Sequence, residues 1–580
     1  MNKDFLPVSL EEGKVYYDNF DGFDVIFVTG DPYYDHPLSG IAILSRLLDK
    51  KGCKVGIISQ PQADLEFKSC GRPNYFFCIT SGLLDSMLAN YTPMLKKREN
   101  VLVPERALMV YTQKLKQLFK DCMTVIGGVE ATIRRFTHFD YKDNALRKGI
   151  LNDTKADILL FGNAERSVLS LLQRMTHCKK KKFEDIREKL DLDSLEGAAF
   201  RIKKAGIGKN VKMLPSFEDC VKDKGKLNLL TRIHYLLPDD SFIEQCGLGY
   251  IQHNRPSHTL TEKEMDFIYG LNFTRKMHPK TKNLEFNKDM VEKLKNSVVI
   301  GRGCWGSCNF CVIPLVQGKE VARRSRQGII KEIEALYING EKKINDLTLP
   351  TLNMYGSSCK LYNVPEKIRS PIINEEITVY NKVEYCNQQC VGCKFRVVND
   401  ELYPILEEVE KLNMKYNTTM ELRSALRHDI ILDQKKLFRK IMEFTSRLKI
   451  APEHVSDKVL KHMNKSTADS FKKFLEEYRK INQEQKTNKN LVPYFVVSHP
   501  GSSMKEMQEL KEFCDENEIF VNLTQVFTPT PGTISTAMYY SGENPITREK
   551  VHVPRSFREK KDQKKLLLSK IKEEFSDENG

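Results

Sequence analysis

Three cysteines lie within eight residues of the stretch GRGCWGSCNFCVIP (301–314), at Cys304, Cys308 and Cys311. Structural zinc takes four tetrahedral ligands, usually from paired CxxC units, so this C-x3-C-x2-C spacing fits zinc poorly. A [4Fe–4S] cluster is also held by thiolates, and three of them leave one iron open to bind a small molecule. Gly303 and Gly306 permit a tight loop that brings backbone N–H groups toward cluster sulfurs.

A second group of cysteines, Cys359, Cys386, Cys390 and Cys393, repeats the C-x3-C-x2-C spacing at its end. Four thiolates could close around a structural zinc and fix a loosely packed insertion. They could instead hold a second, fully ligated [4Fe–4S] cluster suited to electron relay, or remain buried thiols. We favour a metal, and iron–sulfur over zinc, because the same chain already provides a loop for a first cluster.

The first cysteine loop follows a strand-like run, SVVIG (297–301), and precedes a helical stretch, GIIKEIEALYING. Five further strand-like runs alternate with helical stretches: DLTLP (346–350), TTMELRS (418–424), RLKIAP (447–452), LVPYFVVSHPG (491–501) and VNLTQVF (521–527). Six β/α repeats predict a (β/α)6 partial TIM barrel with its active groups on loops at the carboxyl ends of the strands. The first cysteine loop occupies that position after the first strand.

Apolar strand patterns also alternate with helices in the first 200 or so residues, at DVIFVTG (24–30), KVGIIS (54–59), TVIGG (124–128) and ADILLFG (156–162). This α/β alternation predicts a Rossmann-like, doubly wound domain. Ligands in such sheets lie beyond the carboxyl ends of the strands, here near Asp31, Asp35, His36 and Gly127–Gly128. Tight turns and local packing would account for each of these residues taken alone.

A length of 580 residues exceeds one compact core, which indicates two or more domains. We predict the Rossmann-like domain over residues 1–235, a connecting region over 236–295 and the partial barrel over 296–540. The cysteine-containing insertion would occupy residues 355–398 of the barrel, and a basic tail would occupy residues 541–580.

The net charge of +15 can favour nucleic acid, but it is dispersed or lies in short runs such as KKKK at 179–182. We interpret it as solvated lysine surface and expect no nucleic-acid partner. No apolar run approaches the roughly 20 residues that cross a bilayer, and the acidic N-terminus lacks the apolar core of a signal peptide. With fifteen cysteines typical of ligands or buried thiols, these features predict a cytoplasmic protein without a membrane partner.

The cysteine spacing, with Phe310 before the last cysteine, resembles the signature of the radical S-adenosylmethionine (SAM) superfamily. Nine segments in order resemble the YgiQ family of radical SAM proteins, over about residues 5–555: VTGDPYYDHPLSG, GGVEATIRR, DILLFGNAE, GRGCWGSCNFCVIP, DLTLPTLNMYG, SALRHDI, LKIAPEH, LVPYFVVSHPG and TPTPGTISTAMYYSGENP. The N-terminal domain resembles the cobalamin-binding-type domain that often precedes such barrels. The base-off cobalamin signature Asp-x-His-x-x-Gly is not matched by the segment 35–40, DHPLSG, so we do not predict cobalamin.

The resemblance implies a [4Fe–4S] cluster on Cys304, Cys308 and Cys311, with the amino and carboxylate groups of SAM bound to the open iron. One electron from the reduced cluster would cleave SAM and release a 5′-deoxyadenosyl radical, which takes hydrogen from an unknown substrate. A small electron-transfer protein of flavodoxin or ferredoxin type would be the reductant.

The resemblance also places parts of the SAM pocket. Phe310 would lie near the adenine, while Ser424 suits a ribose hydroxyl and Arg427 the carboxylate, which arginine binds bidentately. An ordinary surface ion pair is the alternative for Arg427. The glycine-containing turn usual after the second strand is replaced by LTLPTLN (347–353), where Pro350 and Thr351 would serve instead.

Three further residues follow later strands: Glu453, His454 and His499. They could face a substrate or be structural, and the sequence assigns no catalytic residue beyond the cofactor site. One alternative function is an RNA-modifying methylthiotransferase-like enzyme, favoured by TPTPGT (528–533) and the positive charge, although no basic RNA-binding domain is evident after residue 541. The other is a non-catalytic iron–sulfur or zinc protein. Cleavage of SAM by the reduced protein discriminates between these functions.

Overall fold

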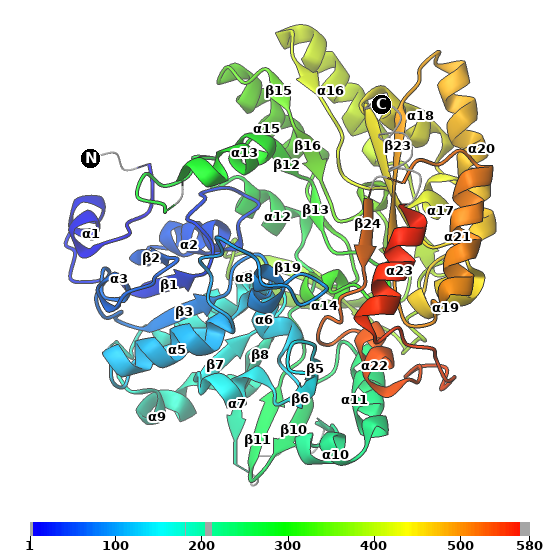
Figure 1. The fold of residues 1–580 in the computed structure, drawn as a ribbon. Helices are drawn as coiled ribbons and strands as arrows, with labels where there is room; N and C mark the ends of the chain where they lie inside the picture. The colour runs from blue at the N-terminus through cyan, green and yellow to red at the C-terminus, as the bar shows by residue number, and fades with distance from the viewer. Residues whose placement is uncertain (1–3, 180, 204–210, 283, 522, 569–580) are drawn as a thin grey trace. The chain divides into compact units, whose positions relative to one another are not determined.

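The computed structural model describes residues 4–568, apart from residues 180, 204–210, 283 and 522. The chain forms two compact units, each of which is discontinuous in sequence (Figure 1). The first unit consists of Met1–Lys295, Leu315–Gly318 and Asn363–Val383. The second consists of Asn296–Pro314, Lys319–Tyr362 and Glu384–Gly580.

A nine-stranded sheet in the order β2-β1-β3-β4-β7-β8-β11-β10-β9 forms the centre of the first unit (Figure 1). Its first five positions are parallel: β2 (Val55–Ser59), β1 (Val25–Thr29), β3 (Phe76–Thr80), β4 (Met123–Ile126) and β7 (Ile158–Leu160). This order is that of a flavodoxin-like doubly wound sheet. The strands are almost wholly buried apolar runs, as parallel strands covered on both faces require. The predicted Rossmann-like fold is confirmed.

The remaining four strands extend this sheet, mostly with antiparallel pairing: β8 (Ala198–Ile202), β11 (Gly249–His253), β10 (Phe242–Cys246) and β9 (Lys212–Met213). β10 and β11 lie in the region 236–295, which we expected to be a connection. Polar side chains buried on these strands, such as Glu244 and Gln252, interrupt the apolar pattern that marks a strand in sequence. Two helices follow, α12 (Glu262–Tyr269) and α13 (Leu284–Leu294).

Amphipathic helices cover the sheet, among them α2 (Gly40–Lys50), α5 (Ala107–Leu118) and α8 (Glu165–Met175). The core packs Leu108, Tyr111 and Leu115 of α5 against strand residues such as Ile26 and Phe77. A β-pair from the predicted insertion also belongs to this unit, β18 (Tyr362–Arg369) with β19 (Glu376–Lys382). Its turn residue Ser370 donates a hydrogen bond to the Glu264 carboxylate at 2.6 Å.

The second unit contains six parallel strand positions, one of which consists of the consecutive strands β15 (Lys343–Ile344) and β16 (Asp346–Thr348), and this confirms the partial barrel. β12 (Ser297–Val299) pairs with β16, and β15 pairs with β21 (Thr419–Met420). A parallel bridge between Leu426 and Ile450 leads to three paired strands, β22 (Arg447–Glu453), β23 (Asn490–Val497) and β24 (Leu523–Val526). Each predicted strand of the barrel coincides with one of these positions.

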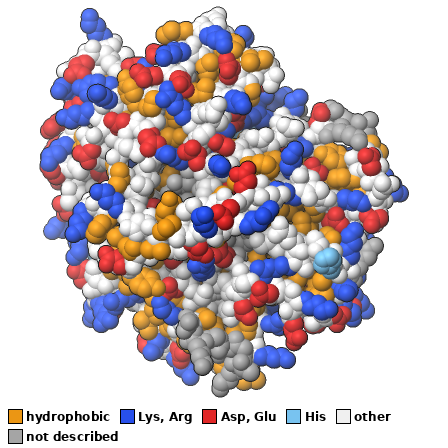
Figure 2. Space-filling view, turned by 180° about the vertical axis from the view of Figure 1, so that it is seen from behind, with side chains coloured by type: hydrophobic (Ala, Val, Ile, Leu, Met, Phe, Trp, Pro, Cys, Tyr) orange, Lys and Arg blue, Asp and Glu red, His pale blue; other side chains and the backbone are white. Residues whose placement is uncertain are grey.

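Helices alternate with these strands: α15 (Arg326–Ile338), α16 (Leu402–Tyr416), α18 (Lys435–Glu443), α20 (Ala468–Glu484) and α21 (Met504–Glu516). Near the end of the chain, α23 (Phe557–Leu567) places the buried Gln563 side chain in hydrogen bonds with Ser498 and Ser502. The predicted basic tail covers residues 541–580, of which residues 569–580 lie outside the described part. No helix in the described part is both long and apolar enough to cross a bilayer. On the face in Figure 2, Lys and Arg are interspersed with Asp and Glu.

Candidate metal centre

The first cysteine loop begins where β12 and the short β13 (Gly301–Arg302) end, at the carboxyl edge of the barrel strands. Gly301 is required because a Cβ atom there would lie 2.7 Å from the carbonyl oxygen of Ala322. Gly303 has a φ of +93°, a left-handed conformation that glycine adopts without strain. The sequence therefore bends sharply away from the strand at the point where the cysteines start.

Backbone hydrogen bonds hold the middle of this loop in place. The Asn309 N–H donates to the carbonyl of Met463 at 2.9 Å, and the Asn309 side chain donates to the carbonyl of His462 at 2.9 Å. The Ser535 N–H in turn donates to the carbonyl of Asn309 at 2.9 Å. These contacts come from the end of α19 (Asp457–Met463) and from α22 (Ile534–Ser541), so the position of the cysteines depends on elements far along the chain in the same unit.

The three thiols lie in one partly buried environment. Cys304 Sγ is 3.5 Å from Thr351 Oγ1 and 3.8 Å from Met354 Sδ. The Cys311 N–H donates to the carbonyl of Cys308 at 3.0 Å. Burial raises the pKa of Cys311 to about 12, and the neighbouring thiols of Cys308 and Cys304 act in the same direction. The thiols of Cys304 and Cys308 therefore lie close enough to Cys311 to oppose its ionisation.

The guanidinium group of Arg427, which follows β21 in the chain, lies beside this loop. Arg427 Nη1 lies 3.7 Å from Cys308 Sγ. A Cβ atom at Gly306 would come within 3.1 Å of Arg427 Nη1 and 3.4 Å of Cys304 Sγ, so only glycine leaves this space open. The other two Arg427 nitrogens bind both oxygens of Asp429, at 2.9 and 2.6 Å. The pair is buried, and Asp429 outweighs the effect of burial and raises the pKa of Arg427.

Within the described residues, no three His, Cys, Asp or Glu side chains stand so that they could hold a metal ion as they are. The chemistry of the donor set nevertheless fits an iron–sulfur cluster. The three thiols belong to one loop, one of them, Cys308, lies beside the buried Arg427, and thiolate ligands are deprotonated when metal binds. The positive charge of Arg427 favours that ionised state.

The other residues predicted for the SAM pocket are distributed around this loop. The Phe310 ring packs edge-to-face against His499, with ring centroids 6.0 Å apart. The Ser424 hydroxyl donates to Asp346 at 2.7 Å, an interaction that the sequence analysis missed. Arg427 pairs with Asp429, two residues along the chain, and this pair is buried and not the surface ion pair that was the alternative to a carboxylate site. The spacing Arg-x-Asp in SALRHDI was the signal that could have indicated it.

Three residues at the ends of β22 and β23 are buried. Glu453 forms an ion pair with Lys465 at 3.6 Å, and burial raises the pKa of its carboxyl group. His454 Nδ1 accepts hydrogen bonds from two backbone N–H groups, whereas its buried Nε2 has no partner. Both nitrogens of His499 are engaged, with the Pro500 carbonyl and the Ser535 hydroxyl at 2.8 and 2.6 Å.

Left-handed backbone occurs at the same two strand ends, at Glu453 (φ +69°) and Ser498 (φ +62°). Residues other than glycine adopt this conformation at a cost, and such positions cluster at functional sites. The sequence has no signal for this strain because neither position is a glycine.

The second cysteine group is linked to the first loop by a contact between Arg396 and Trp305. β17 (Ser358–Cys359) pairs with β20 (Arg396–Val397), which sets Cys359 opposite Arg396. Arg396 Nη2 lies 3.3 Å from Cys390 Sγ, and its guanidinium lies 5.4 Å from the ring centroid of Trp305 in the first loop. Trp305 Nε1 donates to the Ser357 hydroxyl at 2.7 Å.

The remaining two cysteines of this group are less enclosed. Cys386 and Cys393 are half-buried, and the Cys393 N–H donates to the Cys390 carbonyl at 3.2 Å. Glu320 completes the surroundings of Arg396 with an ion pair at 2.7 Å. All fifteen cysteines of the chain lie in the described part, and all have free thiols.

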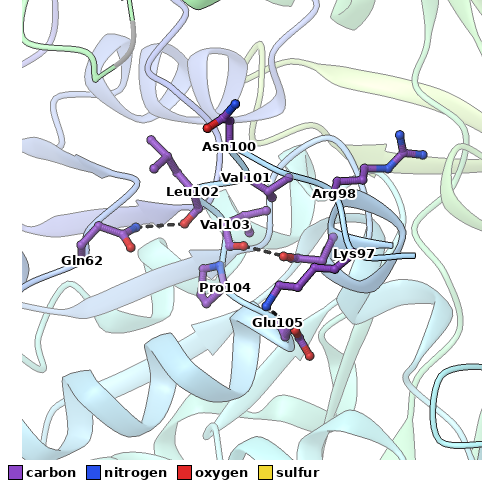
Figure 3. Close-up of a pocket in the computed structure, with 10 residues that line it drawn as sticks. Gln62, Lys97, Arg98, Asn100, Val101, Leu102, Val103, Pro104 and Glu105 are labelled. Atoms are coloured by element: carbon purple, nitrogen blue, oxygen red, sulfur yellow. Dashed lines mark hydrogen bonds and ion pairs between the residues drawn. The ribbon is translucent and has the colours of Figure 1, made fainter. Parts of the chain in front are cut away.

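At the carboxyl edge of the first unit, a hollow of about 560 Å³ lies beyond β2 and β3 (Figure 3). It is lined by Gln62, Asn90, Lys97, Arg98 and the segment 100–105. Gln62 Nε2 donates to the Leu102 carbonyl at 2.9 Å, and Lys97 pairs with Glu105 at 2.9 Å (Figure 3). The hollow thus combines polar and apolar lining with one ion pair, between Lys97 and Glu105.

The residues that we expected near a ligand in the first unit make local contacts. Asp35 binds Arg46, with its Oδ2 2.6 Å from Nη2. His36 Nδ1 accepts from the Leu38 N–H at 3.1 Å, and its Nε2 lies 3.0 Å from the Lys295 carbonyl. Asp31 accepts from the Leu83 N–H, and burial raises the pKa of this carboxyl to about 6.

Comparisons with known proteins agree with these features. Residues 5–297 match the family described as Radical SAM N-terminal, and residues 522–574 match a domain of unknown function, DUF3362. UPF0313 protein MJ1155 of Methanocaldococcus jannaschii is 38% identical over 98% of this chain and 93% of its own length. UPF0313 proteins of Clostridium botulinum strain Kyoto and Thermotoga neapolitana are 35% and 34% identical, over 99% and 98% of this chain and 88% and 99% of their own lengths.

Among solved structures, the radical SAM methyltransferase TsrM of Kitasatospora setae matches with a TM-score of 0.48 and 11% identity, over 88% of this chain and 74% of that chain. That structure contains a tryptophan substrate and a SAM analogue. The family predicted from the motifs is confirmed by the relatives, which align along nearly the whole chain at 34–38% identity. The chain therefore belongs to the UPF0313 family, the YgiQ-type family of radical SAM proteins.

Proposed function

We propose that this protein is an enzyme that uses a [4Fe–4S] cluster and SAM to start a radical reaction on a substrate still to be identified. Membership of a radical SAM family supports the class of reaction. The observation that carries the proposal is the loop of three thiols at the carboxyl end of β12, beside the buried Arg427 guanidinium. Active groups of β/α barrels lie at that edge.

Cys304, Cys308 and Cys311 would hold the cluster. When bound, the cluster would supply one electron that cleaves the sulfonium C–S bond of SAM, leaving methionine and a 5′-deoxyadenosyl radical that takes hydrogen from the substrate. Arg427 directs Nη1 at Cys308 and therefore offsets the negative charge that three thiolates bring. Because Asp429 takes the Nε donor and one of the two Nη2 donors, a SAM carboxylate would have to use Nη1 or the second N–H of Nη2.

We propose that Phe310 and Ser424 contact the nucleoside part of SAM. The Phe310 ring is half-buried beside His499, which leaves part of its surface available to an adenine. The Ser424 hydroxyl already donates to Asp346, so its oxygen remains able to accept a hydrogen bond from a ribose hydroxyl. Neither residue needs to change its present partner for these roles.

We also propose a metal at Cys359, Cys386, Cys390 and Cys393, and an iron–sulfur cluster rather than zinc. Arg396 supports it, since a buried guanidinium beside Cys390 and opposite Cys359 favours thiolates as Arg427 does at the first loop. Its contact with Trp305 brings the two cysteine groups together, as an electron relay requires. A structural zinc at the same four residues is the alternative.

The reductant would be a small electron-transfer protein of flavodoxin or ferredoxin type, because the first cluster must be reduced before each reaction. We place the protein in the cytoplasm, where reducing conditions suit fifteen free thiols. Mixed charges on the face in Figure 2 suit a solvated surface better than a nucleic-acid interface.

Cleavage of SAM tests the proposed function. Anaerobically reconstituted, reduced protein should convert SAM into 5′-deoxyadenosine and methionine, measured by chromatography. Joint replacement of Cys304, Cys308 and Cys311 by alanine should abolish this, whereas Cys514→Ala, a buried cysteine of α21, should not. Cleavage by the triple variant would contradict the ligand assignment. Iron-loaded wild-type protein that never cleaves SAM would favour the non-catalytic alternative.

The methylthiotransferase-like alternative is tested by RNA binding. Binding to phosphates releases counterions, so affinity for RNA falls steeply as salt rises. We expect no tight, saturable binding of bulk tRNA at physiological salt in a filter-binding or fluorescence assay. A nanomolar, salt-sensitive complex would favour the RNA-modifying enzyme instead.

A further inference from the structure

Two consecutive arginines of the first unit are both buried, but only one of them is neutralised. Arg134 donates to both oxygens of Asp85, at 2.5 and 3.1 Å, and to Asp140 at 2.9 Å. Its side chain is 6% exposed. A cation removed from water normally requires such paired carboxylates, because burial of an isolated charge is costly.

Arg135 lies in the opposite kind of surroundings. No carboxylate of the described residues forms an ion pair with it, and burial alone lowers its pKa to about 9. Its Nη1 is buried without a hydrogen-bond partner, and its Nη2 contacts His234 Nε2 at 2.6 Å. The guanidinium lies 3.9 Å from the ring centroid of Phe161 and 4.7 Å from that of Phe136.

A second unsatisfied group lies in the same cluster. His253 is 1% exposed, and neither of its ring nitrogens has a hydrogen-bond partner. Its ring centroid is 4.3 Å from that of Phe136, on which Arg135 also packs. Burial, together with the charges of Arg135 and His234, holds the pKa of His253 well below its ordinary value. A neutral imidazole still carries one N–H donor, so donors from two residues lack an acceptor here.

The carboxyl group of Glu244, on the adjoining strand β10, accepts no hydrogen bond from Arg135 Nη1 or His253. The Glu244 carboxylate of β10 accepts from the Thr137 N–H at 2.9 Å. Burial raises the pKa of Glu244 to about 7, and no cation opposes that effect. Glu244 thus behaves as a buried carboxyl group held by the backbone, and the charge of Arg135 remains uncompensated.

The cluster lies at the edge of the sheet where ligands bind. Phe161 directly follows β7, and His253 is the last residue of β11. β8 joins the two strands, because Ala199 pairs with both Leu159 and His253. This is the carboxyl edge of the doubly wound sheet, and ligands of such sheets lie outside it.

We propose that Arg135, His234 and His253 form a binding site for an oxyanion, the carboxylate or phosphate group of a small molecule. The planar guanidinium matches either group with two parallel N–H donors, and the imidazole of His253 adds a donor from another direction. Phe136 and Phe161 line the site with apolar surface, which strengthens the attraction by excluding water. The site lies within the first unit and does not rest on the proposed radical reaction.

Titration of the full-length protein with small anions tests this site. Inorganic phosphate, acetate and succinate are added separately at constant ionic strength, and calorimetry and thermal unfolding are recorded. We expect saturable binding of one anion per chain and a rise in the unfolding midpoint relative to chloride. Binding of phosphate alone would identify a phosphate site, and binding of acetate or succinate alone would identify a carboxylate site.

Three variants locate the binding. Arg135→Met should weaken it by about 10- to 100-fold, since hydrogen bonds to charged groups contribute about 1.5–3 kcal/mol. His253→Phe keeps the ring packing against Phe136 and should weaken it by about tenfold. The control is Arg72→Met, because Arg72 donates to the carbonyl of Lys120 ahead of β4, at the amino edge of the same sheet. This variant should bind like the wild type.

The unfolding midpoint without anion separates binding from a purely structural role. Arg135→Met should keep the midpoint of the anion-free wild type and lose only the rise that the anion causes, because it removes an uncompensated buried charge. A lower midpoint with the anion-dependent rise intact would overturn the assignment. So would equal stabilisation by chloride, or equal weakening by Arg72→Met. If Arg135→Met does not fold, Arg135→Lys is used instead. It keeps the charge but not the two parallel N–H donors of the guanidinium, and it should still weaken binding about tenfold or more.

Discussion

The two cysteine groups of the second unit share an arrangement that their sequences do not reveal. In each, a buried arginine contacts one cysteine sulfur, Arg427 at Cys308 and Arg396 at Cys390, and each arginine pairs with a carboxylate. They differ in how firmly the arginine is held. Arg427 has two hydrogen bonds to Asp429, whereas Arg396 has a single ion-pair contact with Glu320 and packs on Trp305.

The difference indicates two kinds of site. The first loop is fastened to the barrel by backbone hydrogen bonds at Asn309, at the edge where a barrel carries its chemistry. The second group lies in an insertion and is joined to the first loop through one aromatic ring. A reacting centre needs the first kind of support, and a site that only relays electrons or stabilises the insertion can function with the second kind.

The largest expected effect is the complete loss of one cluster in a variant that keeps the other. We predict more than four irons per chain in reconstituted wild-type protein. The joint alanine variant of Cys304, Cys308 and Cys311 should keep the excess iron and lose the spectral response to SAM. The joint alanine variant of Cys386, Cys390 and Cys393 should lose the excess iron and keep the spectral response to SAM. Elemental analysis and electron paramagnetic resonance measure both.

Two outcomes would contradict an iron–sulfur cluster at the second cysteine group. Four irons with one zinc per chain would make the second group a structural zinc site. Four irons and no zinc would make its cysteines plain thiols. Neither outcome affects the assignment of the first loop, because the two groups are tested by different residues.

The next effect concerns the arginine–carboxylate pairs. Asp429→Asn and Glu320→Gln each leave a buried guanidinium without its charge partner, which costs about 3–5 kcal/mol of the free energy of unfolding in typical cases. We expect the larger loss for Asp429→Asn, because its pair has two hydrogen bonds and its carboxylate is 10% exposed, against 15% for Glu320. Urea unfolding of the metal-free protein measures both. An equal loss, or a larger loss for Glu320→Gln, would mean that the two arginines are equally well held.

Lys473→Met is a suitable control for these variants. Its pair with Asp469 on α20 is exposed, with side-chain exposures of 64% and 68%. Removal of such a pair should change the urea midpoint very little, because solvent screens surface charges.

The smallest effect should come from Trp305→Phe. The variant keeps an aromatic ring but loses the hydrogen bond to Ser357, and it weakens the contact with Arg396. A buried hydrogen bond contributes about 1 kcal/mol and a cation–π contact about 0.5–1 kcal/mol. A double-mutant cycle of Trp305→Phe with Arg396→Met isolates the coupling between the two cysteine groups. A coupling of zero would show that the ring does not join them energetically.

The barrel was predictable because each of its strands is a short run of continuous or alternating apolar residues that precedes a helix. The run in LVPYFVVSHPG is nearly continuous and that in RLKIAP alternates, and both contain strands of the structure. β10 and β11 were not predictable, because Glu244, Gln252 and His253 are buried on them and interrupt the apolar pattern. The hydrogen-bond partners of buried polar residues are often distant in sequence, so a local sequence pattern cannot reveal that such residues are buried.

The candidate site divides in the same way. The cysteine spacing is local, so the first loop could be predicted with its three thiols. The partner of Arg427 is also local, but Asp429 was overlooked because a bound SAM carboxylate was expected instead. The contact of Arg396 with Trp305 joins residues 91 positions apart in sequence and follows only from the fold.

The β18–β19 pair has a consequence for how the chain is made. Residues 363–383 belong to the first unit, and their buried Ile372, Ile377 and Val379 are synthesised well after Lys295. During synthesis from the N-terminus, the first unit therefore cannot finish folding until the ribosome has passed residue 383, by which point the first two of the six barrel strand positions have also been made. A gene fragment that ends at residue 295 would encode an incomplete unit, with Glu264 deprived of the Ser370 hydroxyl. The two units are thus inseparable by any single cut in the chain, although each has its own sheet.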